Sequence, residues 1–151
     1  MQLKRAFKIG LMLAVSVAAS AQTPSEEQSL VASFKVVSND FLKSLVEKQG
    51  CHTRLASPTI PDWWYKECHK FDVDGAKIDV QKTTSLVSPY VGSLVVGDII
   101  SNTTRQKTEP EASADNVITH TREKIMEYSF GYQDGKWRFV SSHVVSDSDA
   151  D

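Results

Sequence analysis

Two Cys-His pairs have the residue types best suited to chemistry, Cys51-His52 and Cys68-His69. Together they offer the ligand types of a zinc site. Adjacent side chains point in different directions, however, whereas zinc ligands are usually paired about two to four residues apart so that they converge on one ion. Because the chain has only these two cysteines, one disulfide is the simpler interpretation, and closing such a loop contributes about 3 kcal/mol to stability. We expect a Cys51–Cys68 disulfide, and neither a metal nor a cofactor.

A second set of candidate residues falls on one face of a predicted strand near the C-terminus. Alternate positions of this strand carry basic and phenolic groups, and the next strand adds a histidine: His120, Arg122, Lys124, Tyr128 and His143. Such a mixture could bind an anion, or His143 could act as a base while Tyr128 donates a hydrogen bond. The alternative interpretation is that the strand leaves the core here and that these side chains are solvated.

The sequence lacks the motifs that several other types of reaction require. The sequence contains no Gly-x-Ser-x-Gly nucleophile motif, no glycine-rich phosphate loop and no His-Glu-x-x-His metal motif. Three successive aromatics, Trp63, Trp64 and Tyr65, are further candidates for ligand contact, because neighbouring side chains do not all share one buried face. In the alternative, two of them simply cover the core. We expect the segment 51–68 to be irregular, with one helical turn at 62–67.

The elements that must position these residues begin with a long amphipathic helix. Ser25 and Gln28 have the types and spacing of a capping box, which places the helix start at Glu26. Gly50 suits a left-handed cap, so we predict a helix over 26–49. Apolar residues recur within it at steps of three and four, as one buried face requires: Leu30, Phe34, Val37, Phe41 and Leu45.

Two Asp-Gly pairs predict tight hairpins, because both central positions of a type I′ turn favour these residues. Asp74-Gly75 would pair Asp72 with Lys77 and Lys70 with Asp79, and would gather apolar residues on one face, namely Phe71, Val73, Ala76, Ile78 and Val80. Asp134-Gly135 would pair Tyr132 with Trp137, Phe130 with Phe139, Tyr128 with Ser141 and Met126 with His143. Between the hairpins we predict a bent central strand over 86–100 and a long mobile loop over 101–116.

The chain divides into three parts of different character. Residues 1–21 have the cationic start, the apolar run and the small residues before the cleavage point of a bacterial-type secretory signal peptide, and the run is too short to span a bilayer. One domain should follow over 22–145, and an acidic tail over 146–151 should be disordered. Removal of the signal peptide lowers the formal net charge from −2 to −5, which argues against a nucleic-acid binder.

The last predicted hairpin carries a family resemblance. Its sequence over 128–140, Tyr-Ser-Phe-Gly-Tyr-Gln-Asp-Gly-Lys-Trp-Arg-Phe-Val, resembles the closing strands of the nuclear transport factor 2 and ketosteroid isomerase superfamily. The order of elements is similar also to the cystatin-like fold, in which a curved sheet wraps a helix. The resemblance implies an α+β roll, with a long N-terminal helix packed on a curved antiparallel sheet of four or more strands.

These observations lead to two hypotheses for function. The first, which we prefer, is an exported, periplasmic or secreted module without enzymatic activity that binds a protein or a small apolar ligand. The second, suggested by the resemblance, is a small non-covalent acid/base enzyme, an isomerase, dehydratase or cyclase, that uses His143 and Tyr128. A cavity in which these two side chains meet would favour the enzyme, whereas a core filled by Phe130, Phe139 and the helix stripe would favour the binding module.

Overall fold

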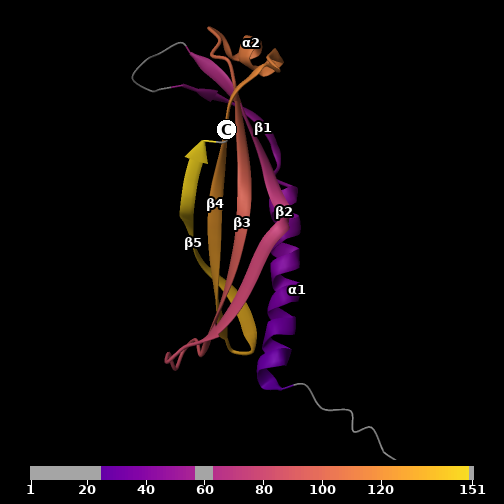
Figure 1. Cartoon of the computed structure of the whole chain (residues 1–151), viewed down its shortest axis with the longest axis vertical. Helices are drawn as coiled ribbons and strands as arrows, with labels where there is room; N and C mark the ends of the chain where they lie inside the picture. The colour runs from indigo at the N-terminus through magenta and orange to yellow at the C-terminus, as the bar shows by residue number, and fades with distance from the viewer. Residues whose placement is uncertain (1–24, 57–62, 150–151) are drawn as a thin grey trace, which may run out of the picture.

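One helix packs against one face of a curled, five-stranded antiparallel sheet, which confirms the α+β architecture expected from the sequence (Figure 1). The computed structural model describes residues 25–56 and 63–149, so the predicted signal peptide, 1–21, lies outside the described residues. The strands lie across the sheet in chain order. The elements are α1 (Glu26–Val46), β1 (Gly50–Leu55), β2 (Trp64–Lys82), β3 (Tyr90–Thr103), α2 (Glu109–Ala114), β4 (Ile118–Gln133) and β5 (Lys136–Asp149).

Helix α1 begins at the residue that the sequence predicts. Ser25 Oγ accepts a hydrogen bond from the backbone N–H of Gln28, whose side chain accepts one from the N–H of Ser25, so the capping box is complete. The helix ends at Val46 rather than at Gln49, because the N–H of Gln49 bonds to Val46 in a tighter turn. Gly50 then starts β1 with a φ of 143°, a conformation that favours glycine.

The core lies where α1 crosses the lower half of the sheet, and aromatic rings fill it. At its centre Phe34 packs against Leu94 and Phe130, all three buried. The ring centroid of Phe34 lies 5.5 Å from that of Phe130 and 4.7 Å from that of Trp137, whose Nε1 donates a hydrogen bond to the helix at Ser33. The predicted stripe of α1 faces this core, with Leu30, Phe34 and Leu45 buried and Val37 and Phe41 partly buried.

Strand β2 replaces the hairpin predicted at Asp74-Gly75, and that prediction is wrong. The strand continues beyond the pair and stays next to β3 on both sides of it, with a register shift between Asp72 and Lys77. The N–H of Gly75 bonds to the carboxylate of Asp72 at 3.1 Å, so the local turn chemistry makes a bulge and does not reverse the chain. The physical reason is that β3 is long enough to pair with both halves of β2.

Strand β1 and the disulfide occupy the segment predicted to be irregular. Cys51 lies directly opposite Cys68 in the β1–β2 pairing, and the two form the disulfide expected from the sequence. The helical turn predicted over 62–67 is wrong, because β2 already begins at Trp64 and pairs with β1 from that residue onward. The disulfide therefore joins two neighbouring strands of the sheet.

The central strand β3 starts later and ends later than predicted. Leu86 is fully exposed, and β3 begins only at Tyr90, directly after Pro89. It then continues to Thr103, into the segment 101–116 predicted to be a mobile loop. The rest of that segment contains α2, whose capping box is formed by Thr108 and Glu111.

The prediction of the closing hairpin is correct at the turn, but the strand register differs from the prediction farther from the turn. Asp134 and Gly135 have φ values of 50° and 75°, as a type I′ turn requires, and the predicted pairs next to it, Tyr132 with Trp137 and Phe130 with Phe139, are confirmed. Bulges at 140 and 145 then change the register. Strand β5 continues to Asp149, so the expectation of disorder is wrong for 146–149, whose backbone pairs with 122–125 of β4.

Candidate functional site

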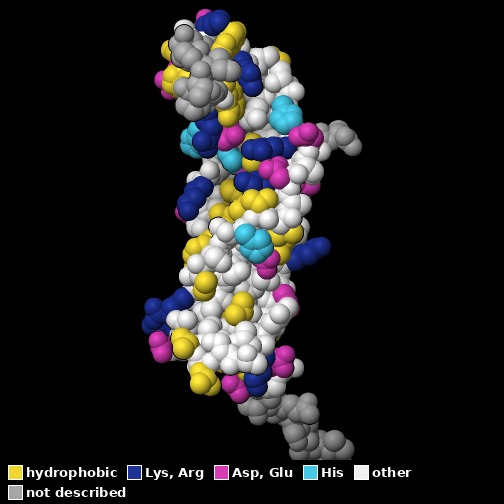
Figure 2. All heavy atoms as spheres, turned by 90° about the vertical axis from the view of Figure 1, so that its left-hand side faces the viewer, with side chains coloured by type: hydrophobic (Ala, Val, Ile, Leu, Met, Phe, Trp, Pro, Cys, Tyr) yellow, Lys and Arg dark blue, Asp and Glu magenta, His cyan; other side chains and the backbone are white. Residues whose placement is uncertain are grey.

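The face of the sheet that packs against α1, called the inner face below, becomes polar toward its upper end. Its central part is apolar, since Leu94 and Phe130 contact the helix there. Seen from the β5 side, charged and histidine side chains gather over the upper half of the molecule (Figure 2). Strand pairing places polar residues from all five strands on this upper inner face: Arg54, Glu67, His69, Asp98, Asn102, His120, Arg122, Lys124, Asp147 and Asp149.

Four of these residues form a continuous charge network, Arg54, Glu67, His69 and Asp98. The Nε of Arg54 lies 2.6 Å from Glu67 Oε1, and His69 Nε2 lies 3.1 Å from the same oxygen. His69 Nδ1 lies 2.9 Å from Asp98 Oδ2. Both carboxylates are buried, at 7% exposure for Glu67 and 6% for Asp98. Positive and negative groups thus alternate from the edge strand β1 to the central strand β3.

The network favours the charged form of His69. Burial by itself lowers the pKa of His69, but hydrogen bonds and charge attraction from Asp98 and Glu67 together outweigh it, so the pKa lies above the ordinary 6.5. A charged imidazole donates from both ring nitrogens, and here each nitrogen faces a carboxylate. His69 therefore has no free nitrogen with which to take a proton from a substrate.

Tyr128 and His143, the predicted acid/base pair, are not brought together. Tyr128 lies on the inner face, where its ring packs 4.8 Å from that of Phe41, and burial, followed by the charge of Asp98, raises the pKa of its hydroxyl. His143 pairs with Glu127, the neighbour of Tyr128, and its Nε2 lies 3.2 Å from Glu127 Oε2. The predicted pairing is wrong because the bulge at 140 adds one residue and moves His143 to the opposite face of the sheet.

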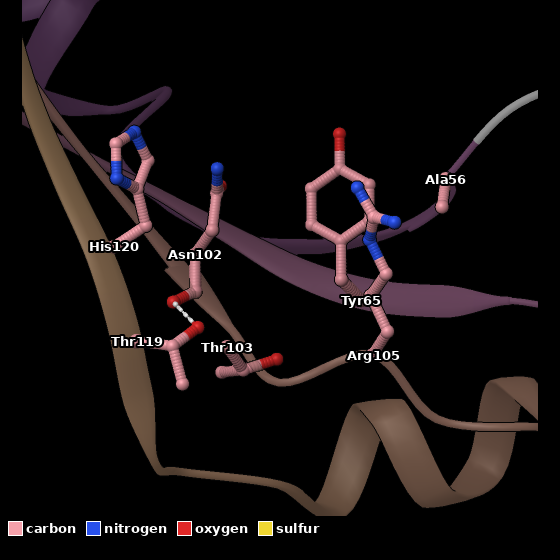
Figure 3. A pocket seen from close by; sticks show the side chains of 7 residues that line it. All are labelled: Ala56, Tyr65, Asn102, Thr103, Arg105, Thr119 and His120. Carbon is pink, nitrogen blue, oxygen red and sulfur yellow. Dashed lines mark hydrogen bonds between the residues drawn. The ribbon is translucent and has the colours of Figure 1, made fainter.

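A polar pocket of about 330 Å³ opens at the upper end of the sheet, called the upper pocket below (Figure 3). The side chains of Tyr65, Asn102, Arg105 and His120 all point to the same side there. They come from β2, β3, the β3–α2 connection and β4. The complete lining is Ala56, Tyr65, Asn102, Thr103, Arg105, Thr119 and His120.

The backbone on both sides of Arg105 is firmly held. Gln106 exchanges two backbone hydrogen bonds with Trp64, at 2.7 and 2.8 Å. On the other side, Thr104 donates a hydrogen bond to Asp115. That bond, together with bonds from the Val117 N–H and the Gln106 side chain, lowers the pKa of Asp115 to about 2. The loop that carries Arg105 is therefore tied to β2 and to the end of α2.

The remaining predicted residues do not line the upper pocket. Trp63 stacks under Lys107, whose Nζ lies 3.6 Å from the ring centroid, and Trp64 contributes its backbone to the pairing with Gln106. Arg122 binds Asp147 at 3.3 Å. Lys124 is paired in register with Asp98 on the inner face. Of the predicted ligand contacts, Tyr65 and His120 line the pocket.

Sequence reasoning missed most of the charge network and much of the pocket. Arg54, Glu67 and Asp98 were not identified, because they converge only through the pairing of β1, β2 and β3. Asn102 and Arg105 fall in the segment 101–116, which the sequence predicts to be a mobile loop. One signal in the sequence could have identified part of the network. Glu67 and His69 are two residues apart, so both lie on the same face of any strand that contains them.

Two further properties of the described residues bear on the site. Within 25–56 and 63–149, no three His, Cys, Asp or Glu side chains are grouped as a metal ion would require. Over the same ranges, none of the helices has the length and apolar character needed to cross a membrane. Comparison with protein-family models, with characterised proteins and with solved structures finds no match to this chain.

Proposed function

We propose that the protein is an exported binding module without enzymatic activity, and that the upper pocket is its ligand site. The observation that carries this proposal is the pocket itself, a polar cavity lined by side chains from three strands and an anchored loop. A site on paired strands holds its polar groups in place before the ligand arrives, which reduces the entropic cost of binding.

The arrangement of the acid/base groups supports binding over catalysis. The interior that would house a reaction in a roll is filled by Phe34, Leu94 and Phe130. Tyr128 and His143 lie on opposite faces of β4 and β5, and both nitrogens of His69 are engaged by carboxylates. Neither His69 nor His143 lines the upper pocket, and the Nε2 of His120, which does line it, lies 3.2 Å from a carboxylate oxygen of Asp149.

The chemistry of the pocket supports a small polar ligand rather than the apolar ligand suggested by the aromatic run. Trp63 and Trp64, the two most apolar of the three aromatics, do not line it, and most of the lining side chains carry polar groups. A volume of about 330 Å³ is at the small end of the range for ligand sites. The pocket therefore suits a compact molecule with several hydrogen-bonding groups.

Export and family are part of the same proposal. The disulfide is consistent with an oxidising compartment outside the cytoplasm, and the N-terminal sequence has the pattern of a signal peptide. We place the protein in the periplasm or outside the cell. The helix on a curled antiparallel sheet supports a relationship to the nuclear transport factor 2-like or cystatin-like rolls, at the level of fold.

The test is a thermal-shift screen of the oxidised, exported protein against small polar metabolites. A ligand of the upper pocket should raise Tm saturably, because a ligand that binds only the folded state stabilises it by mass action. Replacement of a lining side chain, Tyr65→Ala or His120→Ala, should weaken that shift. The matched control is Trp63→Ala, an adjacent aromatic outside the pocket, and it should leave the shift unchanged.

Two results would overturn the proposal. The first is a screen in which no compound raises Tm, or in which Tyr65→Ala and His120→Ala leave every shift as it was. The second is conversion of the bound compound, seen by mass spectrometry after incubation, since a binding module returns its ligand chemically unchanged.

A further inference from the structure

We propose that the ligand of the upper pocket is a small organic anion, a carboxylate or a phosphate monoester, and that the guanidinium of Arg105 holds its charged group. This inference rests on the proposed function and adds the chemical class of the ligand. Its starting point is the set of groups that surround the pocket. Arg105 and His120 line it, and no Asp or Glu side chain does so among the described residues.

Several of the polar groups that face the pocket can donate hydrogen bonds. The guanidinium of Arg105 has only donors, and the hydroxyl of Tyr65 and the amide nitrogen of Asn102 point to the same side (Figure 3). Thr119 has its hydroxyl hydrogen committed to the carbonyl of Asn102, at 3.4 Å. A ligand that satisfies several donors at once needs several acceptor oxygens, which carboxylates and phosphates supply.

Arg105 is also distinguished from the other arginines of the upper inner face. Arg54 is paired with Glu67 and Arg122 with Asp147. In the part of the chain that the structure describes, no carboxylate forms an ion pair with Arg105, and its side chain is exposed at the pocket. Because Thr104 and Gln106 anchor the backbone on each side, little backbone order has to be gained when the guanidinium binds an anion.

His120 is the second basic residue of the pocket, and an acidic residue lies next to it. Its Nε2 lies 3.2 Å from Oδ1 of Asp149 on β5, a carboxylate that is 80% exposed. The acid offsets part of the positive charge but is not itself among the lining groups. The geometry thus presents Arg105 as the main charge for a ligand and leaves His120 and Tyr65 as hydrogen-bonding partners.

The experiment compares four probes that share one carbon frame: glycerate, glycerol phosphate, neutral glycerol and cationic aminopropanediol. Binding to the oxidised protein is measured by titration calorimetry at low salt. Glycerate or glycerol phosphate should bind, and the neutral and cationic probes should not. Which of the two anions binds better identifies the charged group as a carboxylate or a phosphate.

Two variants test whether Arg105 supplies the positive charge that binds the anion. Arg105→Gln should weaken anion binding roughly tenfold or more, the effect of losing one charged hydrogen-bonding partner. Arg105 is exposed, so this variant should keep the wild-type Tm in the absence of ligand. The control is Arg138→Gln on β5, an exposed arginine whose nearest carboxylate, on Asp134, is 4.0 Å away, and it should bind anions like the wild type.

Failure of this inference is distinguishable from failure of the proposed function. If a neutral or cationic compound binds in a manner that depends on Tyr65, and the anions do not, the anion assignment is wrong while the pocket stands as a ligand site. If Arg105→Gln binds anions as tightly as the wild type, the role of Arg105 is wrong. If the metabolite screen also finds no ligand, both proposals fall.

Discussion

His69 on β2 and Asp98 on β3 share a hydrogen bond of 2.9 Å beneath the upper inner face, and Glu67 holds the other nitrogen of the same ring. The imidazole therefore bridges two buried carboxylates. Since Glu67 also binds Arg54, the network connects the edge strand β1 to the centre of the sheet. Its strength depends on the proton that His69 carries.

The contribution of His69 to stability should therefore decrease as the pH rises through its folded pKa. Its folded pKa is raised above 6.5, so its contribution is fully present below the unfolded pKa and is lost as pH rises through the higher folded pKa. The free energy of unfolding should differ more between wild type and His69→Gln at about pH 5 than at about pH 9. Urea titrations at both pH values measure this, and an equal difference at the two would contradict it.

The disulfide should account for a sizeable part of the stability. Replacement of Cys51 and Cys68 by Ala should lower the free energy of unfolding by about 3 kcal/mol, mainly through the greater freedom of the unfolded chain. Reducing agent should lower Tm of the wild type and leave the double variant unchanged, whereas a chelator should affect neither. Two free thiols in the mass spectrum of the exported protein would contradict the bridge.

Gly92 should resist substitution. A Cβ at this position would lie 2.6 Å from ring atoms of Phe34, the centre of the core, so Gly92→Ala must displace the ring or the helix. We expect a loss of about 1–3 kcal/mol in urea unfolding, as for other overpacked cores. The control is Gly97→Ala on the same strand, where the nearest atom is the carboxylate end of Glu123 at 3.1 Å. Equal losses in the two variants would show that backbone freedom, and not the ring, is responsible.

Asp115 should control the order of the loop that presents Arg105. Its pKa is about 2, so its contribution to stability is present above its ordinary pKa of 3.8 and is lost as pH falls through about 2. In Asp115→Ala, the amide hydrogen of Val117 should exchange faster with solvent at neutral pH, because it loses its acceptor. Asp40→Ala, a change at an exposed position of α1, is the control, and unchanged exchange in Asp115→Ala would contradict this role.

The sequence predicts correctly those elements whose conformation depends only on residues close to them in the chain. The helix start needs only Ser25 and Gln28, and the closing turn needs only Asp134 and Gly135, so both were correct. The same turn signal failed at Asp74-Gly75, because its outcome depends on β3, which can pair with both halves of β2. A turn motif indicates which local conformation the backbone favours. Whether the chain reverses there depends on pairing with strands that are distant in the sequence.

The candidate site was predicted less well because it depends on register. A single added residue at 140 reversed the face of His143 and separated it from Tyr128, and the alternation of apolar and polar residues gave no sign of this bulge. The charge network depends on the register of β1 against β2, in a segment that the sequence predicts to be irregular. The sequence offers Tyr65 as one of three successive aromatics and His120 as one of the basic strand residues, but their meeting in one pocket depends on four separate segments.

The bulges of β5 at 140 and 145 also affect the solubility of the protein. Strand β5 is the last in the sheet, and a long regular edge offers its free N–H and C=O groups as a template for strands of other molecules. Each bulge breaks that row and twists the strand, and Arg138, Asp147 and Asp149 add charges beside the breaks. The two bulges, which the sequence does not reveal, thus make the free edge of β5 a poor template for aggregation.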